Sequence, residues 1–121
     1  MPDLVLVDTS VWVAHLRESS TRLADLLEED RVLIHDFVVG ELACGNLKNR
    51  LEIISLMQAL PKAPVLEHNE VLDFIERRNL MGQGLGWVDV HLLGAALLTD
   101  APLWTLDRRL KAAAEGLGVG F

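Results

Sequence analysis

The chain has 121 residues with 11 basic and 18 acidic side chains, a formal net charge of −7 and hydrophobic residues at half its positions. This composition excludes intrinsic disorder, and the length predicts one domain over residues 1–121. The apolar runs are shorter than the roughly 20 residues of a transmembrane helix, and an acidic Asp3 replaces the basic start of a signal peptide. We therefore expect a cytoplasmic protein without a membrane span.

Cysteine usage excludes two further classes of protein. Cys44 is the one cysteine of the sequence, so the chain forms no internal disulfide and has no zinc-finger ligand set. We expect Cys44 to be a small buried apolar residue. The acidic balance disfavours nonspecific binding of nucleic acid through a basic surface, although it permits a local site.

The first half of the chain predicts strands that alternate with helices. Leu4–Val7 is an apolar run of the length of a strand covered on both faces, and Val32–His35 is a second. Helices are expected to begin at residues that cap their first turn. The expected caps are Asp8, Thr9 or Ser10 for a first helix, Ser20 or Thr21 for a second, and Asp36 for a helix over Phe37–Ala43.

The second half continues the alternation. The expected elements are helices over 48–60, from Asn69 to about 80, over Trp87–Leu98 and over Arg108–Glu115, with strands at Leu103–Leu106 and Val119–Phe121. A glycine-rich loop precedes Trp87, and we expect it to be a mobile connection. Trp12 and Trp104 are expected in the core. The pattern predicts an α/β fold with a mostly parallel sheet.

Four acidic residues are expected to meet at one edge of this sheet. Asp8 and Asp107 follow strands, Glu41 lies about one turn into a helix, and Asp89 lies in the first turn of the apolar helix. Ligands of parallel sheets bind beyond the carboxyl ends of the strands. Because clustered carboxylates repel one another unless a cation lies among them, the pattern predicts a Mg²⁺ or Mn²⁺ site. Such an ion supports hydrolysis of phosphodiesters.

Each acid also has a simpler interpretation. Asp8 and Asp107 are suited to cap helices, and Asp89 favours the dipole of its helix. Glu41 differs because its neighbours are apolar, and a buried glutamate seldom lacks a partner. The convergence of all four at the ligand-binding edge favours a functional site.

Four segments resemble the PIN-domain ribonucleases in their order and spacing, and within that family the VapC-type toxins of bacterial toxin–antitoxin pairs. These segments are Val7–Val13, Phe37–Leu42, Gly86–Leu93 and Leu103–Asp107. The resemblance covers nearly the whole chain. It implies a three-layer α/β/α domain with a small, mostly parallel sheet, and a metal-dependent endoribonuclease.

The resemblance also assigns roles to residues. It assigns metal binding to the four acids Asp8, Glu41, Asp89 and Asp107, and it makes Asp8 and Asp89 the central ligands. Thr105 matches a hydroxyl that orients a carboxylate or a metal-bound water, and the alternative is an ordinary strand residue. Ser10 or Thr9 matches the hydroxyl after the first acid. Asp36 stands where relatives often carry proline, and it is either a spare ligand or a cap.

Three partners follow from the resemblance and the charge. RNA is the expected substrate, with steering by basic residues near the acids: Lys48, Arg50, Arg108, Arg109 and Lys111. A small VapB-like antitoxin is expected to insert an arginine among Asp8, Asp89 and Asp107 while its tail packs beside Trp12 or the helix of Leu23–Leu27. A homodimer is expected through the helices at Leu51–Leu60 and Val71–Leu80.

Two other functions remain as alternatives. A haloacid-dehalogenase-like phosphatase also has an aspartate after an apolar strand, but it needs a second aspartate where Ser10 stands. A non-catalytic α/β module with an acidic pocket would need a lysine at the strand edge, and no lysine follows an apolar strand in the sequence. His91 is expected to be a core or interface residue, and Trp87 either packs or stacks on a base.

Overall fold

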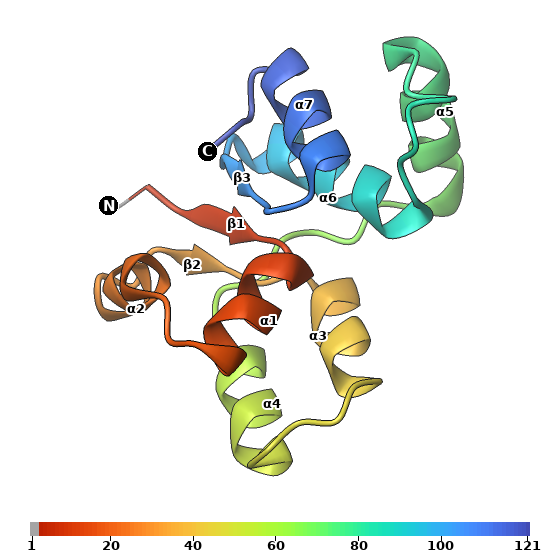
Figure 1. Cartoon of the computed structure of the whole chain (residues 1–121). Coiled ribbons are helices and arrows are strands. Elements are labelled where there is room, and N and C mark those ends of the chain that lie inside the picture. The colour runs from red at the N-terminus through yellow and green to blue at the C-terminus, as the bar shows by residue number, and fades with distance from the viewer. Residues whose placement is uncertain (1–2) are drawn as a thin grey trace.

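A computed structural model describes residues 3–121 and has three layers. In Figure 1 the small sheet lies between one group of helices, α1–α4, and another, α5–α7. The helices are α1 Thr9–Arg17, α2 Thr21–Glu28, α3 Asp36–Ala43, α4 Arg50–Gln58, α5 His68–Arg78, α6 Trp87–Thr99 and α7 Arg108–Gly116. This architecture confirms the predicted α/β/α class.

The sheet is parallel, with strand order β2-β1-β3, and it places two site residues side by side. The strands are β1 Val5–Val7, β2 Val32–Leu33 and β3 Leu103–Trp104. All three side chains of β1 are fully buried, which explains its unbroken apolar run. Val7 pairs with Trp104, so the chain leaves the two strands at the same edge, at Asp8 and Thr105.

The apolar helix α6 forms much of the core. Its residues from Val90 to Ala96 are all buried, which accounts for a helix without a polar face. A Cβ on Gly94 would lie 2.6 Å from Leu66 Cδ1, so the glycine allows the chain before α5 to pack closely on α6. No helix within residues 3–121 has the length and apolar character needed to cross a membrane.

The helix caps were predicted correctly in part. Asp8, Ser20 and Asp107 precede α1, α2 and α7 and accept hydrogen bonds from the first turn of each helix. Of the three candidates for the cap of α1, Asp8 is the cap, whereas Thr9 and Ser10 lie inside the helix and their hydroxyls bind other side chains.

The predictions for two other caps were wrong. His35, not Asp36, caps α3: its Nδ1 accepts from the Phe37 N–H at 3.0 Å. A neutral imidazole offers an acceptor at this position just as an asparagine does. At α5 the helix begins earlier than Asn69, after Glu67, whose N–H donates to Glu70 Oε1 at 3.1 Å.

Several expected elements are shorter. The helix expected over 48–60 covers Arg50–Gln58, and the strand expected at Val119–Phe121 is a single bridge between Leu103 and Gly120. Cys44 is exposed rather than buried, because it follows the last turn of α3.

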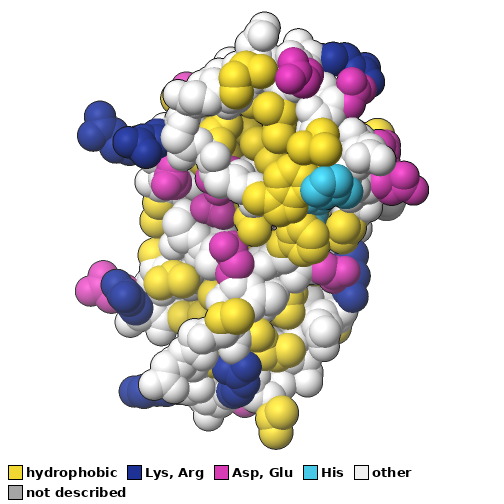
Figure 2. Space-filling model, turned by 90° about the vertical axis from the view of Figure 1, so that its right-hand side faces the viewer, with side chains coloured by type: hydrophobic (Ala, Val, Ile, Leu, Met, Phe, Trp, Pro, Cys, Tyr) yellow, Lys and Arg dark blue, Asp and Glu magenta, His cyan; other side chains and the backbone are white. Residues whose placement is uncertain are grey.

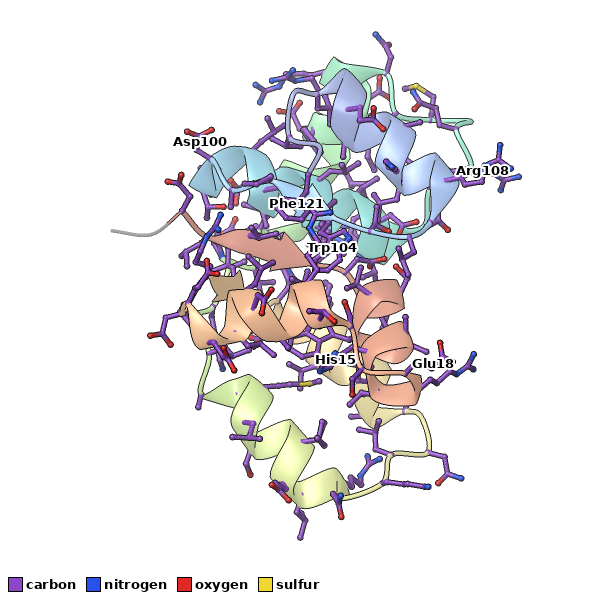
Figure 3. The ribbon with its side chains drawn as sticks, turned by 60° about the vertical axis from the view of Figure 1, so that its left-hand side comes forward. His15, Glu18, Asp100, Trp104, Arg108 and Phe121 are labelled. Carbon is purple, nitrogen blue, oxygen red and sulfur yellow. The ribbon has the colours of Figure 1, made fainter. Side chains whose placement is uncertain are left out.

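Trp12 is buried as expected, whereas Trp104 is only half-buried. The Trp104 ring packs against Phe121 at 5.3 Å between centroids, and Figure 3 shows the two rings beside each other. The Arg22 guanidinium lies 4.3 Å from the Phe121 ring centroid and covers the pair from solvent. Trp104 is therefore covered on one side by these side chains, while it also packs against the main core.

Candidate metal centre

Asp8 is held at the carboxyl end of β1 by two hydroxyl groups. The carboxylate is buried, with 6% of the residue exposed, and its Oδ2 accepts from Ser10 Oγ at 2.7 Å and from Thr105 Oγ1 at 2.8 Å. Its Oδ1 accepts no hydrogen bond from residues 3–121. The carboxylate is thus fixed through one oxygen, and the other is free to bind a ligand.

Both hydroxyls that contact Asp8 also accept a backbone N–H, and their oxygens lie 3.3 Å from each other. Thr105 Oγ1 accepts from the Asp107 N–H, and Ser10 Oγ accepts from the Leu106 N–H, each at 3.0 Å. Because a backbone N–H occupies the acceptor side of each hydroxyl, its proton is directed to Asp8. The expected hydrogen bond from Thr105 to a carboxylate is confirmed, and the turn after β3 is joined to the start of α1.

Asp107 and Asp89 both use one oxygen to cap a helix. Asp107 Oδ1 accepts from the N–H groups of Arg109 and Leu110, each at 3.0 Å, at the start of α7. Asp89 Oδ2 accepts from the Gly86 N–H at 2.8 Å, at the start of α6. Their simpler interpretations as capping and dipole residues are therefore correct, and each still has a second oxygen without a protein donor among the described residues.

Glu41 was expected among apolar neighbours, but the structure exposes its side chain. Its Oε1 accepts from Thr9 Oγ1 at 2.6 Å, which ties α3 to the start of α1. The apolar residues around it in the sequence, such as Val38, Val39 and Leu42, lie on the buried side of α3. The sequence argument from burial was wrong for Glu41.

The charges of the four acids act on one another. Partial burial raises the pKa of Asp89 above its ordinary value, and the negative charges of Asp8, Asp107 and Glu41 raise it further. The hydrogen bond from Gly86 acts in the opposite direction and lowers it. The charges of Asp8, Asp107 and Glu41 thus reach Asp89, and the convergence of the four acids on one metal ion stays a prediction.

The donor set fits a hard divalent cation that retains water. Four carboxylates each keep one oxygen free of protein hydrogen bonds, and oxygen is the ligand atom that Mg²⁺ prefers. Within residues 3–121, no three Asp, Glu, His or Cys side chains lie close enough together to hold one metal ion. Mg²⁺ usually takes one or two carboxylates and keeps several waters, so the metal site stays a prediction.

Asp36 and Trp87, which were also considered for the site, have other partners in the structure. Asp36 pairs with Lys62 at 3.4 Å and is absent from the charges that act on Asp89. Trp87 is 39% exposed, and its ring packs against His91 and His68 at 4.9 and 5.0 Å. Figure 2 shows acidic side chains in the middle of this face, beside hydrophobic side chains grouped around a histidine.

A cluster of aromatic rings joins α3 and α6, and only part of it was predicted from the sequence. His91 is buried as expected, and its ring contacts Phe37 at 4.7 Å. His35 is fully buried, and burial together with the charge of His91 lowers its pKa to about 4, while Asp36 acts in the opposite direction. Burial, followed by the charge of His68, lowers the pKa of His91. The sequence signal for His35 was its position between an apolar strand and a helix.

Comparison with known proteins was consistent with this geometry. The PIN domain family model matches residues 5–116. Two relatives, each called Ribonuclease VapC32, come from Mycobacterium tuberculosis strains CDC 1551 / Oshkosh and ATCC 25618 / H37Rv. Each is 49% identical to this chain over 119 residues, which cover 98% of this chain and 96% of the relative.

Proposed function

The chain belongs to the PIN-domain family, and on this premise we propose that it is a divalent-metal-dependent endoribonuclease, the toxin of a VapC-type toxin–antitoxin pair. The observation that carries the proposal is the group of four carboxylates with one free oxygen each, centred on an Asp89 whose pKa its neighbours raise. The names of the two relatives support ribonuclease activity. RNA in the cytoplasm is the substrate.

Each residue of the site has a separate role in the proposed reaction. Mg²⁺ or Mn²⁺, when bound, lowers the pKa of a water and stabilises the charge on the phosphate and the leaving oxygen. Asp8 and Asp89 are the central ligands through their free oxygens, and Asp107 and Glu41 complete the acidic rim. Thr105 keeps Asp8 in one orientation through its 2.8 Å hydrogen bond. The same network favours this function over a dehalogenase-like phosphatase, because Ser10 binds Asp8 where that class has an aspartate.

Cleavage of RNA by the purified protein tests the proposal. A labelled RNA is incubated with the protein in MgCl₂, in MnCl₂ and in EDTA, alongside Asp8→Asn and Asp89→Asn. We expect cleavage with either metal, none in EDTA, and losses of orders of magnitude in both variants. Full activity in EDTA, or in both variants, would show that the acids are not a metal-dependent nuclease site.

An apolar groove between α1, α2 and α4 suits the tail of a VapB-like antitoxin. It has a volume of about 330 Å³ and is lined from α1, α2 and α4 by Trp12, His15, Leu16, Leu27, Ile53, Leu56, Met57 and Leu60. Figure 3 shows His15 in the space between the α1–α2 pair and α4. The tail fills this groove, and an arginine from it enters among the carboxylates, where its planar fork binds in place of the metal.

Competition between the arginine and Mg²⁺ tests this form of inhibition. We expect the antitoxin to inhibit less as Mg²⁺ rises, and expect replacement of its arginine by alanine to restore cleavage more than it weakens binding. Inhibition that is indifferent to both changes would refute the mechanism.

A homodimer is the second part of the assembly. Leu51 on α4 and Leu72 on α5 are 86% and 45% exposed, so both are accessible to a second copy of the chain. Since α4 also lines the groove, α5 is the better candidate for the dimer contact. Sedimentation equilibrium at micromolar concentration should give twice the 13.4 kDa of one chain, and a single 13.4 kDa species would refute the dimer.

A further inference from the structure

Arg109 lies flat across the glycine loop that leads into α6. A Cβ on Gly84 would lie 2.7 Å from both Cδ and Nη1 of Arg109 and 3.0 Å from its Nε. Three atoms of one side chain therefore rest on the space that only glycine leaves open. Gly84 also has a φ of +74°, which disfavours other residues.

The charge of Arg109 has no acidic partner. Within the part of the chain that the structure describes, the ion pairs are Arg31–Glu29, Lys62–Asp36 and Arg77–Asp73. Arg109 is exposed and forms none, although the sequence contains 18 acids. A cation in the first turn of a helix also interacts unfavourably with the helix dipole, so the charge of Arg109 does not stabilise α7.

The position of Arg109 links the two segments that carry Asp107 and Asp89. Its backbone N–H donates to Asp107 Oδ1 at 3.0 Å, while its side chain covers Gly84. Two residues after Gly84, the Gly86 N–H binds Asp89 Oδ2 at 2.8 Å. The backbone of Arg109 thus contacts one acid of the site, and its side chain covers the loop that leads to another, whereas Figure 3 shows the neighbouring Arg108 directed outward from α7.

We propose that Arg109 binds a phosphate of the RNA next to the one held at the metal centre, with Gly84 as the platform that keeps the guanidinium in place. This inference rests on the proposed ribonuclease function. A guanidinium presents a planar fork of donors that matches a phosphate, and its stem on Gly84 reduces the freedom lost on binding. In a chain of net charge −7, Arg109 supplies a cation for the polyanionic substrate.

Binding of a fluorescein-labelled single-stranded RNA, measured by anisotropy in MgCl₂ over a series of KCl concentrations, tests the phosphate contact. The measurement uses an Asp89→Asn background, so that RNA is not cleaved. For single strands each phosphate contact contributes about 0.7 to the slope of log affinity against log salt. We expect Arg109→Ala to reduce the magnitude of this negative slope by about 0.7 and Arg109→Lys to leave it unchanged. Arg78→Ala, which removes the same charge from α5, should leave the slope unchanged.

Two glycine variants separate the platform from backbone strain. Gly82 and Gly84 have nearly equal φ angles, +73° and +74°, but a Cβ on Gly82 would meet nothing within 4 Å. We expect Gly84→Ala to weaken RNA binding several-fold by displacing Arg109, and Gly82→Ala to have the same stability cost without that effect. Equal affinities in the two glycine variants would overturn the role of Gly84 as the platform.

The outcomes also distinguish this inference from the proposed function. If the unsubstituted protein cleaves RNA with Mg²⁺ but Arg109→Ala has the same slope as Arg78→Ala, the phosphate contact is wrong and the ribonuclease assignment stands. If the magnitude of the slope falls as expected but no RNA is cleaved with any metal, the contact stands and the ribonuclease assignment is wrong. If the protein binds no RNA, both are wrong.

Discussion

Helices α3 and α6 each contribute an acidic side chain to the metal centre and neutral rings to the cluster that joins them. The acidic region and the ring cluster have opposite effects on stability. Glu41 and Asp89 lie in a group of like charges, and that repulsion raises the pKa of Asp89. On the other side the rings of the two helices pack edge to face: His35 and Phe37 from α3, and Trp87 and His91 from α6. The acidic edge costs stability, whereas the ring cluster contributes it.

The ring packing between α3 and α6 holds the mutually repelling carboxylates of these two helices in place. The centroids of the Phe37 and His91 rings are 4.7 Å apart, which fixes α3 against α6. This packing requires neutral imidazoles, because His35 is fully buried and its Nε2 has no hydrogen-bond partner among residues 3–121. Each region can therefore be perturbed separately.

The largest effect is expected at the acidic edge. Asp89→Asn keeps a side-chain oxygen to accept the Gly86 N–H but removes the charge that a cation needs. We expect RNA cleavage to fall by about 100-fold or more, and Asp8→Asn to do the same. Initial rates on a labelled RNA measure the change, and an unchanged far-ultraviolet circular dichroism spectrum controls for folding. Losses below about threefold in both variants would contradict a central role for these acids.

The next largest effect is a pH dependence of stability from the ring cluster. The pKa of His35 is about 4 in the fold and returns to 6.5 on unfolding, so the unfolded chain binds a proton first as the pH falls. Above about pH 7 His35 has no effect on the free energy of unfolding. Between pH 6.5 and 4 it lowers that free energy by about 3 kcal/mol in total, as urea denaturation at a series of pH values would measure.

His35→Asn is the matched control for this dependence. Asparagine still caps α3 and accepts the Phe37 N–H, but it does not titrate in this range. The variant should lose less stability than the unsubstituted protein over the same pH interval. Equal losses in both proteins would mean that another group is responsible.

A smaller effect is expected at the support for Asp8. Thr105→Val keeps the shape of the side chain and removes the hydroxyl that donates to Asp8 Oδ2, leaving Ser10 as the remaining side-chain donor. Cleavage should fall about 10-fold, because one hydrogen bond to a charged group is worth about 1.5–3 kcal/mol and part of it survives through Ser10. Thr99→Val removes a hydroxyl bound only to carbonyl groups of α6 and should leave the rate unchanged. Equal rates in the two variants would remove Thr105 from the site.

The smallest effect is expected at Thr9. Its hydroxyl donates to Glu41 Oε1 at 2.6 Å, and this contact is partly exposed to water. Thr9→Val should lower cleavage by about threefold, through a looser Glu41 and not through loss of a ligand. Single-turnover rates at saturating RNA would detect the change, and a Glu41→Gln background should abolish it. A Thr9 effect that persists in that background would point to another role.

The acidic edge was largely predictable from the sequence, because the positions of its residues follow from the segments next to them. Asp8 and Asp107 directly follow buried strands, and parallel strands bring their carboxyl ends to one edge. Thr105 could be paired with Asp8 only by resemblance to the family, since the register of β1 and β3 is not readable from either segment. The burial argument for Glu41 failed because one helix has both a buried and an exposed side.

The ring cluster and the Arg109 platform were not predictable in the same way. His35 was assigned to a strand and Asp36 to the cap, because propensity favours aspartate at that position and nothing local indicates a neutral imidazole. Gly84 and Arg109 are 25 positions apart, and their contact depends on how α7 packs beside the loop before α6. Such contacts are set by tertiary packing, which the periodicity of a sequence does not encode.

The melting temperature of the unsubstituted protein and of Asp89→Asn, followed over a MgCl₂ titration at constant ionic strength, tests the central claim most directly. Without Mg²⁺ the variant should melt slightly higher, by about 2 °C, because it lacks one repelled and partly screened charge. With rising Mg²⁺ the unsubstituted protein gains stability through binding and should pass above the variant, whose melting temperature stays nearly constant. Two curves that rise in parallel, or an unsubstituted protein that melts higher throughout, would contradict a site in which four carboxylates repel one another until a cation joins them.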